Sequence, residues 1–565
     1  MKLPASSLLR FRPRLFDQLR GYDRESFARD LGAGLAVAVV ALPLAMAFAI
    51  ASGLKPEAGL FTAIIGGFLI SGLGGSRVQI GGPAGAFIVI LYGILERYGL
   101  ANLLIATMLA GVILLAMGAL RLGTLVRYLP LPIVIGFTNG IAVLIALSQL
   151  KDFFGLSIPR MPGDFFGQVA TLAQHAHTLR PAAVLLAAIS LVFLFAWPHL
   201  IAALARRSPR RARLVGALPA TVLVLVLATA AVRLLHLPVE TIGSRFGGIP
   251  QSLPAFAWPH FDWVLVQQLL APALTIALLG AIESLLCARV ADSVIGDRHD
   301  PNQELMAQGL ANLVSPLFGG MAATGTIART MTNIRSGAVS PVAGMVHALA
   351  LLLIVLVAAP LASSIPLAAL AAILLFVAWN MGEWREFAHM RNFALSYRVQ
   401  MLAAFGLTVV VDLTVAVQTG LVLACVFFIH RMASLSTVER LVRTDLPPAV
   451  RAFAMKGSLF FGAVDKLESL LDADAIAPHV LLLDLSQLLH MDASGLHALE
   501  GLLHDLQRGH HRLLLSGVQG QPRRIMENSG FLQRLGRDNC RDSVDQAIRS
   551  LAPQAQGGGL DGQAA

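Results

Sequence analysis

The chain has 565 residues, of which 56% are hydrophobic and only 13% are charged, and its mean hydropathy is +0.71. An average soluble protein carries about 25% charged residues. Residues 1–435 contain 48 charged side chains, whereas the 117 residues of 436–552 contain 27, a proportion typical of soluble domains. The first part therefore cannot be a water-soluble globule. We predict an all-α polytopic membrane domain followed by a small aqueous domain.

Charge, cysteine content and motifs exclude several functions. A net charge of +10 would suggest nucleic acid for a soluble chain, but here it fits basic cytoplasmic loops, so we predict no nucleic-acid partner. The three cysteines are widely spaced and indicate neither a disulfide framework nor a metal site. No Walker A loop occurs, so the chain encodes no ATP drive. No cofactor is predicted, and an enzyme is the least favoured function because no nucleophile–base pattern is visible.

Apolar segments begin at Leu31. Residues 1–30 are basic and have no continuous apolar core, so we predict a cytoplasmic N-terminal segment and no cleavable signal peptide. Asp30 is expected to be the N-cap or a first-turn acid of the first helix. Some segments are shorter than the ~20 residues that a spanning helix needs. We predict about fourteen segments, which together form a transmembrane domain over 31–432. They lie near 31–52, 57–75, 83–96, 101–120, 129–150, 181–200, 214–236, 263–292, 303–318, 325–338, 341–361, 364–381, 397–412 and 414–431.

Loop charge predicts the orientation. An even number of crossings leaves both termini on one side of the membrane. The loops on that side hold twelve basic residues against seven on the other side, and the cluster from Arg206 to Arg213 weighs most. The positive-inside rule therefore predicts a multi-pass inner-membrane protein with cytoplasmic N- and C-termini.

Two short segments each follow a glycine-rich stretch. One follows Gly81 to Gly85 and the other follows Gly319 to Gly325; Gly82 and Gly325 are 243 residues apart. Seven segments fall in each half, and because seven is odd the second half would have inverted topology. Paired short segments at corresponding positions indicate a binding site near the midplane of the membrane.

Helix ends inside the membrane favour an anion. A helix that begins there leaves about four backbone N–H groups unpaired, and lipid cannot satisfy them. Two such ends facing each other would present converging positive dipole ends, and glycine would let an anion approach the backbone. The alternative is that the glycines only allow tight helix packing. The paired positions, with Thr324, Thr326 and Arg329 beside the second one, favour the anion site.

Glu283 is a carboxylate within an otherwise apolar segment. At the bilayer centre a carboxylate costs at least ~2.5 kcal/mol on insertion scales, so it should face a polar cavity or bind a cation. It either couples transport to H⁺ or Na⁺ or forms a structural ion pair with Arg329 or Arg289. We favour the coupling role.

After Arg431 the pattern changes to short strands alternating with helices, which indicates a small α/β layer. We place this domain at 436–552 and expect residues 553–565 to be disordered. Strands are predicted at 457–463, 480–485 and 512–517, and helices at 493–508 and 522–529.

Three stretches, residues 33–49, 79–84 and 324–338, resemble the first, third and tenth helix signatures of the sulfate permease (SulP) family of anion transporters. The tail resembles the STAS domain, which these transporters share with anti-sigma factor antagonists. The resemblance covers nearly the whole chain. It implies two inverted seven-segment repeats, with a core of segments 1–4 and 8–11 that carries the anion and a gate of segments 5–7 and 12–14.

The resemblance also assigns residues. It places the anion between the N-termini of segments 3 and 10, and it places the coupling-ion carboxylate of the family at Glu283. In the antagonists the serine that matches Ser494 is phosphorylated; the alternative is a helix N-cap formed by Asp492 or Ser494. The residues matching the anion site are Phe48, Pro83, Ala84, Gly85, Thr326, Ile327, Ala328 and Arg329.

We therefore predict a secondary anion transporter that works by alternating access as a homodimer, with H⁺ coupling through Glu283. The alternatives are a Na⁺-coupled symporter or anion exchanger of the same fold, a passive anion channel, and a membrane-tethered regulator whose tail domain is the working part. Sulfate, bicarbonate and dicarboxylates are candidate substrates by resemblance. The expected partners are this anion, the coupling ion, the lipid bilayer and a cytoplasmic regulatory protein on the STAS domain.

Overall fold

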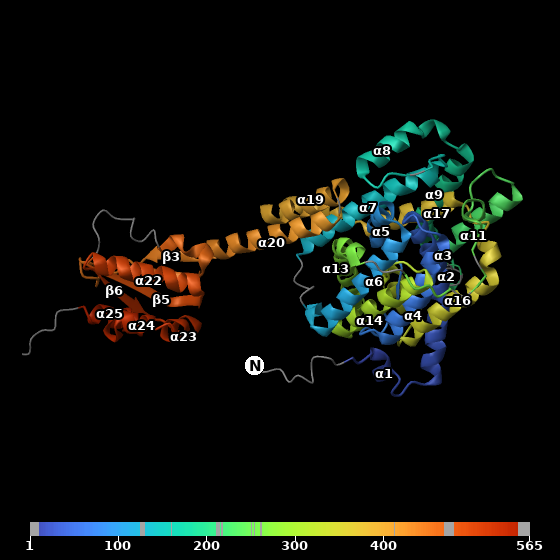
Figure 1. Ribbon diagram of the computed structural model, residues 1–565. Helices are drawn as coiled ribbons and strands as arrows, with labels where there is room; N and C mark the ends of the chain where they lie inside the picture. Colours follow the sequence, from blue (N-terminus) through green and yellow to red (C-terminus); the bar gives the residue numbers. More distant parts are fainter. Residues whose placement is uncertain are drawn as a thin grey trace, which may run out of the picture. The chain divides into compact units, whose positions relative to one another are not determined.

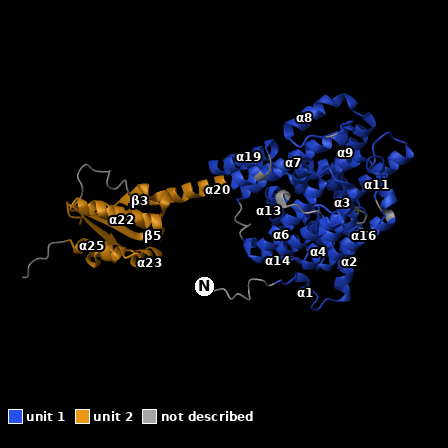
Figure 2. Ribbon diagram, in the orientation of Figure 1, with its two compact units in different colours: residues 1–421 blue, residues 422–565 orange. Residues whose placement is uncertain are grey.

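The computed structural model describes residues 11–124, 130–159, 161–210, 215, 219–249, 251–252, 255–259, 263–411, 413–467 and 479–551. The chain forms two compact units, residues 1–421 and 422–565 (Figure 2). This division falls within helix α20 (Leu413–Leu435), whereas the sequence analysis ends the membrane domain at residue 432. The end of α20 groups with the second unit, in which Lys466 donates a hydrogen bond to the Ala433 backbone oxygen (2.6 Å). The tail 553–565, Arg211 and Arg213 lie outside the described residues.

Helices dominate the first unit (Figure 1). Eight helical stretches in the described part of the chain are long and apolar enough to cross a membrane, so the prediction of an all-α membrane domain is confirmed. Each of the fourteen predicted segments contains a helix, while the number of crossings stays a prediction. With α20, these helices are α2 (Arg24–Ala51), α3 (Pro56–Phe61), α4 (Gly67–Leu73), α5 (Ile88–Tyr98), α6 (Leu100–Ala119), α7 (Leu131–Phe154), α9 (Pro181–Arg207), α11 (Ala220–Leu234), α13 (Trp263–Ile295), α14 (Pro301–Val314), α15 (Ile327–Arg335), α16 (Val342–Ala362), α17 (Leu367–Met381) and α19 (Leu395–Val410).

The helices pack in two groups. In one group α2 packs against α16, and α6 packs against α13 and α14. In the other group α7 packs against α17 and α19, and α9 packs against α11 and α17. These groups match the core and the gate that the resemblance implies. Small residues bring core backbones together: a Cβ on Gly111 of α6 would lie 2.7 Å from the backbone oxygen of Gly309 of α14.

Two helices of the core are too short to span a bilayer. Helix α5 has 11 residues and α15 has nine, which at ~1.5 Å per residue is about half of a hydrocarbon layer. Each follows a two-residue strand, β1 (Gly81–Gly82) or β2 (Thr324–Gly325). The two strands pair antiparallel, with Gly81 opposite Gly325 and Gly82 opposite Thr324. The two glycine-rich stretches therefore meet, 243 residues apart in the sequence.

The second unit contains a five-stranded sheet in the order β3-β4-β5-β6-β7, which confirms the predicted α/β domain. Strand β3 is antiparallel to β4, and the other neighbouring pairs are parallel. The elements are β3 (Thr437–Arg440), β4 (Val450–Leu459), β5 (Val480–Met491), α22 (Ala493–Arg508), β6 (Arg512–Ser516), α23 (Gly520–Asn528), α24 (Phe531–Leu535), β7 (Cys540–Arg541) and α25 (Val544–Arg549).

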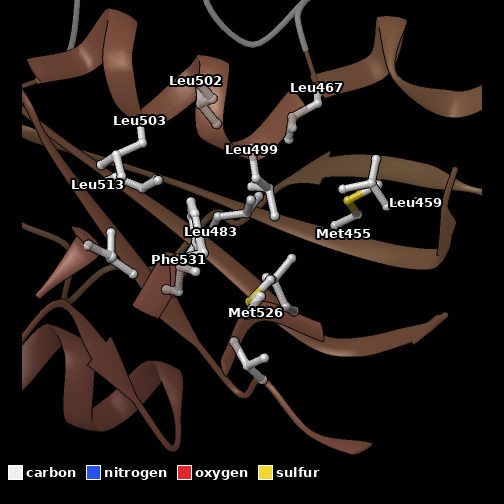
Figure 3. Packing of buried hydrophobic residues seen from close by; sticks show 14 of the residues in the cluster. Met455, Leu459, Leu467, Leu483, Leu499, Leu502, Leu503, Leu513, Met526 and Phe531 are labelled. Atoms are coloured by element: carbon white, nitrogen blue, oxygen red, sulfur yellow. The ribbon is translucent and has the colours of Figure 1, made fainter. Parts of the chain in front are cut away.

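Both faces of this sheet are buried. On β5, Leu481 and Leu483 belong to one apolar cluster with the buried side of α22, whereas Leu482 belongs to a second cluster with Ala547 and Ile548 of α25. A strand covered on both sides needs an unbroken apolar run rather than an alternating one, which explains the leucines of β5. Figure 3 shows the first cluster, in which Leu499, Leu502 and Leu503 of α22 lie against the sheet. The sheet contributes Leu483 of β5 and Leu513 of β6 to it.

Candidate anion-binding site

The two half-helices α5 and α15 are joined by the residues that precede them. The backbone oxygen of Ile80 accepts hydrogen bonds from the N–H (2.9 Å) and the hydroxyl (3.1 Å) of Thr326. The N–H of Ile80 donates to the hydroxyl of Thr330 (2.9 Å). Together with the β1–β2 pairing, these bonds fix the beginning of one broken segment against the beginning of the other.

Neither half-helix has a side-chain cap at its N-terminus. A 3₁₀ turn (Gly85–Phe87) leads into α5 after Ala84, and α15 begins after Thr326. The Thr326 hydroxyl is directed to Ile80 instead of to the helix. By contrast, the side chain of Asp300 caps α14. Within the 3₁₀ turn the N–H groups of Phe87 and Ile88 donate to the backbone oxygens of Ala84 and Gly85. No side chain caps the beginning of this turn or the first turn of α15, so the N–H groups there are available to water or a ligand, and the positive dipole ends favour an anion.

Phe48 and the backbone of segment 3 come together as the resemblance implies. Phe48 extends from α2, is 5% exposed, and its ring lies 3.4 Å from the position that a Cβ on Gly85 would occupy. Pro83 and Ala84 are buried beside it. The ring therefore closes one side of the space in front of the first half-helix.

The first turn of α15 is open on one side. Thr326 and Arg329 are buried, whereas Ile327 is 37% exposed and Ala328 is exposed. The beginning of this half-helix is therefore accessible on the side of Ile327 and Ala328.

Arg329 is the largest fully buried side chain of the described residues, at 1% exposure. One guanidinium nitrogen, Nη2, donates to the backbone oxygen of Pro83. The other, Nη1, is buried without a hydrogen-bond partner, and no ion pair joins Arg329 to a described carboxylate. A buried guanidinium needs a negative partner. Arg329 thus brings a positive charge and a free donor to the junction of the two half-helices.

Glu283 lies half-buried on α13, close to β2 and to the half-helix α15. One turn earlier, the backbone oxygen of Gly280 accepts a hydrogen bond from Thr324 (2.9 Å), and one turn later Cys287 donates to Thr330 (3.3 Å). The side chain of Glu283 forms no hydrogen bond or ion pair with any described residue. The alternative of a structural pair with Arg329 or Arg289 is therefore not realised in this conformation, and Arg289 is exposed.

Sequence reasoning missed the polar residues that hold the junction together. Gln79 donates from Nε2 to the hydroxyl of Ser284 on α13 (2.9 Å), and Thr330 bonds both Ile80 and Cys287. Gln79 and Ser284 are each buried. The available signal was weak: single polar residues two positions before Gly81 and directly after Glu283, which are ordinary in a loop or at a helix surface.

Changing Gly82 to alanine is expected to lower both stability and anion affinity. Gly82 has φ +148°, which other residues rarely adopt, and an added Cβ would lie 2.5 Å from Nη1 of Arg329. The strain should cost about 1–3 kcal/mol, measured as thermal unfolding of the purified protein in detergent. Gly93→Ala on α5 is the matched control, because nothing lies within 4 Å of its added Cβ. An unchanged melting temperature for Gly82→Ala would contradict the close approach of Arg329.

In the second unit the structure shows which residue of the Met491–Leu496 loop is the N-cap of α22. The carboxylate of Asp492 accepts a hydrogen bond from the N–H of Gly495 (2.8 Å), so Asp492 is the N-cap of α22. Ser494 is exposed in the first turn of the helix. It borders a cavity of about 870 Å³ that is also lined by Asp465, His497 and Asp505. Ser494 is therefore accessible and is not required as a cap.

Comparisons with known proteins agree with this architecture. Residues 27–403 match the model of the Sulfate permease family, and residues 442–547 match the STAS domain. A protein named "Putative sulfate transporter YvdB" from Bacillus subtilis (strain 168) is 42% identical over 541 residues, which cover 94% of this chain and 99% of that protein. The bicarbonate transporter BicA of Picosynechococcus sp. is 30% identical over 551 residues, covering 92% of this chain and 94% of BicA.

Solved structures give the same result. The transmembrane domain of a cyanobacterium bicarbonate transporter BicA aligns with a TM-score of 0.62 and 32% identity, covering 70% of this chain and 98% of that domain. SLC26A9 aligns with a TM-score of 0.82 over 95% of this chain and 92% of that chain, and at 19% identity it shows the shared fold alone. The family match spans the membrane region with both half-helices, and the second match spans the α/β tail. The chain therefore belongs to the sulfate permease family and carries a C-terminal STAS domain.

Proposed function

We propose that this protein is a secondary active transporter of a small anion, of the sulfate, bicarbonate or dicarboxylate type. The observation that carries the proposal is the junction itself: two uncapped half-helix N-termini meet beside the buried guanidinium of Arg329. These groups supply positive potential and unpaired N–H donors without forming a closed set of protein contacts. The names of the relatives, which include sulfate and bicarbonate transporters, support the same substrate class.

The proposed cycle is alternating access, in which the core carries the anion past the gate. Glu283 binds H⁺ while the anion site is occupied, so that the carboxylate crosses the membrane in its uncharged form. We place the protein in the inner membrane as a homodimer with both termini cytoplasmic. Lipid, the anion and the coupling ion are its partners, and no nucleic acid is involved. The STAS domain is the proposed contact for a cytoplasmic regulatory protein.

Uptake by proteoliposomes tests this function. Purified protein is reconstituted and given labelled sulfate, bicarbonate, a dicarboxylate or chloride, with and without an inward H⁺ or Na⁺ gradient. We expect saturable uptake of at least one anion that an H⁺ gradient drives uphill. Uphill uptake driven by Na⁺ alone would assign Na⁺ coupling, and uptake that never saturates and runs only downhill would indicate a channel. Background uptake of every anion would overturn the proposal and favour the regulatory role of the tail.

Ser494 is the proposed modification site of the tail. A phosphate in the first turn of α22 would interact favourably with the positive end of the helix dipole. Phosphopeptide mapping of protein purified from its own cells should find phosphate on Ser494.

Because Asp492 caps the helix, Asp492→Ala should lower the free energy of unfolding of the domain by about 1 kcal/mol, whereas Ser494→Ala should leave it unchanged. A lower stability of Ser494→Ala would show that Ser494 has a structural role in the domain.

A further inference from the structure

Glu304, on α14, is a carboxylate buried to 0% exposure that the sequence analysis did not single out. Its two oxygens accept four hydrogen bonds. Oε2 accepts from the backbone N–H groups of Gly75 (2.9 Å) and Ser76 (3.2 Å), and Oε1 accepts from Nε2 of Gln308 (3.0 Å) and from the hydroxyl of Ser284 (3.3 Å). No ion pair joins it to a described cationic side chain. Hydrogen bonds alone therefore hold this carboxylate in place.

These contacts continue to the anion site. The hydroxyl of Ser284, which bonds Glu304, also accepts from Nε2 of Gln79 (2.9 Å). Gln79 directly precedes Ile80, whose backbone holds the N–H and hydroxyl of Thr326. Glu304 thus fixes residues 75–80 at both ends, directly at Gly75 and through Ser284 at Gln79.

The approach of this segment to α14 depends on glycine. A Cβ on Gly74 would lie 2.9 Å from Oε2 of Glu304, and a Cβ on Gly75 would lie 2.1 Å from the backbone oxygen of Asp300. Only residues without a side chain let the two N–H groups reach the carboxylate. The turn and the carboxylate are therefore fitted to each other.

We propose that Glu304 is a positioning residue of the anion site. It does not touch the anion, but it fixes residues 75–80, and through them it sets the beginning of α5 against the beginning of α15. This inference rests on the proposed function in one respect: the ends of the half-helices are where the anion binds. What positioning requires is a hydrogen-bond acceptor facing Gly75 and Ser76, rather than a negative charge.

Two substitutions separate the acceptor from the charge. Glu304→Gln keeps an oxygen for Gly75 and Ser76, and its amide group can donate to Oε1 of Gln308, which is buried without a hydrogen-bond partner. Glu304→Ala leaves the two N–H groups unpaired. In proteoliposomes, Glu304→Ala should raise the KM for the transported anion at least tenfold and change kcat less than threefold. Glu304→Gln should keep the KM within threefold of the wild type.

Hydrogen–deuterium exchange supplies a readout that does not depend on transport. Peptides covering 74–82 should exchange faster in Glu304→Ala and at the wild-type rate in Glu304→Gln. If the wild type transports no anion, the proposed function fails, while the exchange rates still decide the positioning role. If Glu304→Ala does not fold, Ser284→Ala replaces it, because it removes the hydroxyl between Glu304 and Gln79 and keeps the bonds to Gly75 and Ser76. Gln79 then keeps only its bond to the backbone oxygen of residue 284 (3.2 Å), and the KM should again rise.

Asp30 is the matched control. It is also buried to 0% exposure, and it accepts hydrogen bonds from Tyr22, from the N–H of Val339, and from the N–H and hydroxyl of Ser340 at the beginning of α16. Burial, together with the hydrogen bond to Asp30, raises the pKa of Tyr22 to about 12, so this donor stays protonated during the assay. Asp30→Ala should lower the melting temperature as Glu304→Ala does, with the KM and the exchange of 74–82 unchanged.

Three outcomes would overturn the inference. The first is an unchanged KM in Glu304→Ala. The second is a KM in Glu304→Gln as high as in Glu304→Ala, which would show that the charge matters rather than the acceptor. The third is an equal rise of KM in Asp30→Ala, which would assign the effect to lost stability of the core as a whole.

Discussion

Glu283→Gln is expected to abolish gradient-driven accumulation of the anion while leaving anion binding measurable. Glu283 has no cationic partner among the described residues, and it lies one turn from residues that contact β2 and the half-helix α15. Glutamine has the shape of the protonated carboxyl but cannot release a proton, so the variant has no coupling ion to exchange. The uncharged side chain also avoids the cost of at least ~2.5 kcal/mol that a carboxylate meets at the bilayer centre, so the fold should be retained.

The measurement is the initial rate and the final level of uptake under an inward H⁺ gradient. We expect the final level to fall to the equilibrium value, with saturable exchange of external for internal anion persisting without a gradient. Glu25→Gln is the control for the chemical change, because Glu25 is an exposed carboxylate in the first turn of α2. Accumulation at the wild-type level in Glu283→Gln would remove Glu283 from the coupling step.

The fold of the membrane domain was largely predictable from the sequence because hydrophobic length is a strong signal in a bilayer. The boundaries were less predictable. Helix α2 begins at Arg24, seven residues before the predicted segment, because Asp23 caps it by accepting from the N–H of Ser26 (2.8 Å). Asp30 was expected to be that cap or an acid of the first turn. It lies instead inside the helix and bonds Val339 and Ser340, a tertiary contact across 309 residues that no local pattern reveals.

The candidate anion site was predictable in outline and not in detail. The paired glycine-rich stretches predicted that two broken segments meet, and the β1–β2 pairing agrees with this. The side chains that hold the junction were missed, because Gln79, Ser284 and Glu304 act through partners more than 20 residues away or on other helices. A polar residue at the end of a segment resembles an ordinary interfacial residue until its partners are known.

In the STAS domain, too, the sequence predicted some strands less well than others. Strand β4 covers 450–459, whereas the prediction placed the strand at 457–463, because the mixed sequence of its first half lacks a continuous apolar run. Strands β3 and β7 were not predicted; they have four and two residues, and pairing at the edges of the sheet defines them. The buried strand β5 was predicted from residue 480, since an apolar run covered on both faces is a clear signal.

Arg329→Met is expected to weaken anion affinity strongly while largely preserving the packing of the core. The guanidinium is 1% exposed, bonds Pro83, and keeps Nη1 without a partner. Methionine fills a similar volume without charge or donors. A hydrogen bond to a charged group contributes about 1.5–3 kcal/mol, so the KM for the anion should rise roughly 10- to 150-fold. Arg329→Lys should recover part of this loss, since it keeps the charge but not the planar fork.

The comparison that decides the role of Arg329 is with Arg335→Met, at the exposed end of the same helix α15. Both changes remove one positive charge from α15, so a general effect of charge on the approach of the anion would raise both KM values and would weaken at high salt. We expect Arg335→Met to leave the KM within twofold and the Arg329 effect to persist at high salt, because a buried donor acts at short range. Wild-type affinity in Arg329→Met, with normal folding, would show that this guanidinium serves the structure of the junction and that the unpaired backbone N–H groups alone hold the anion.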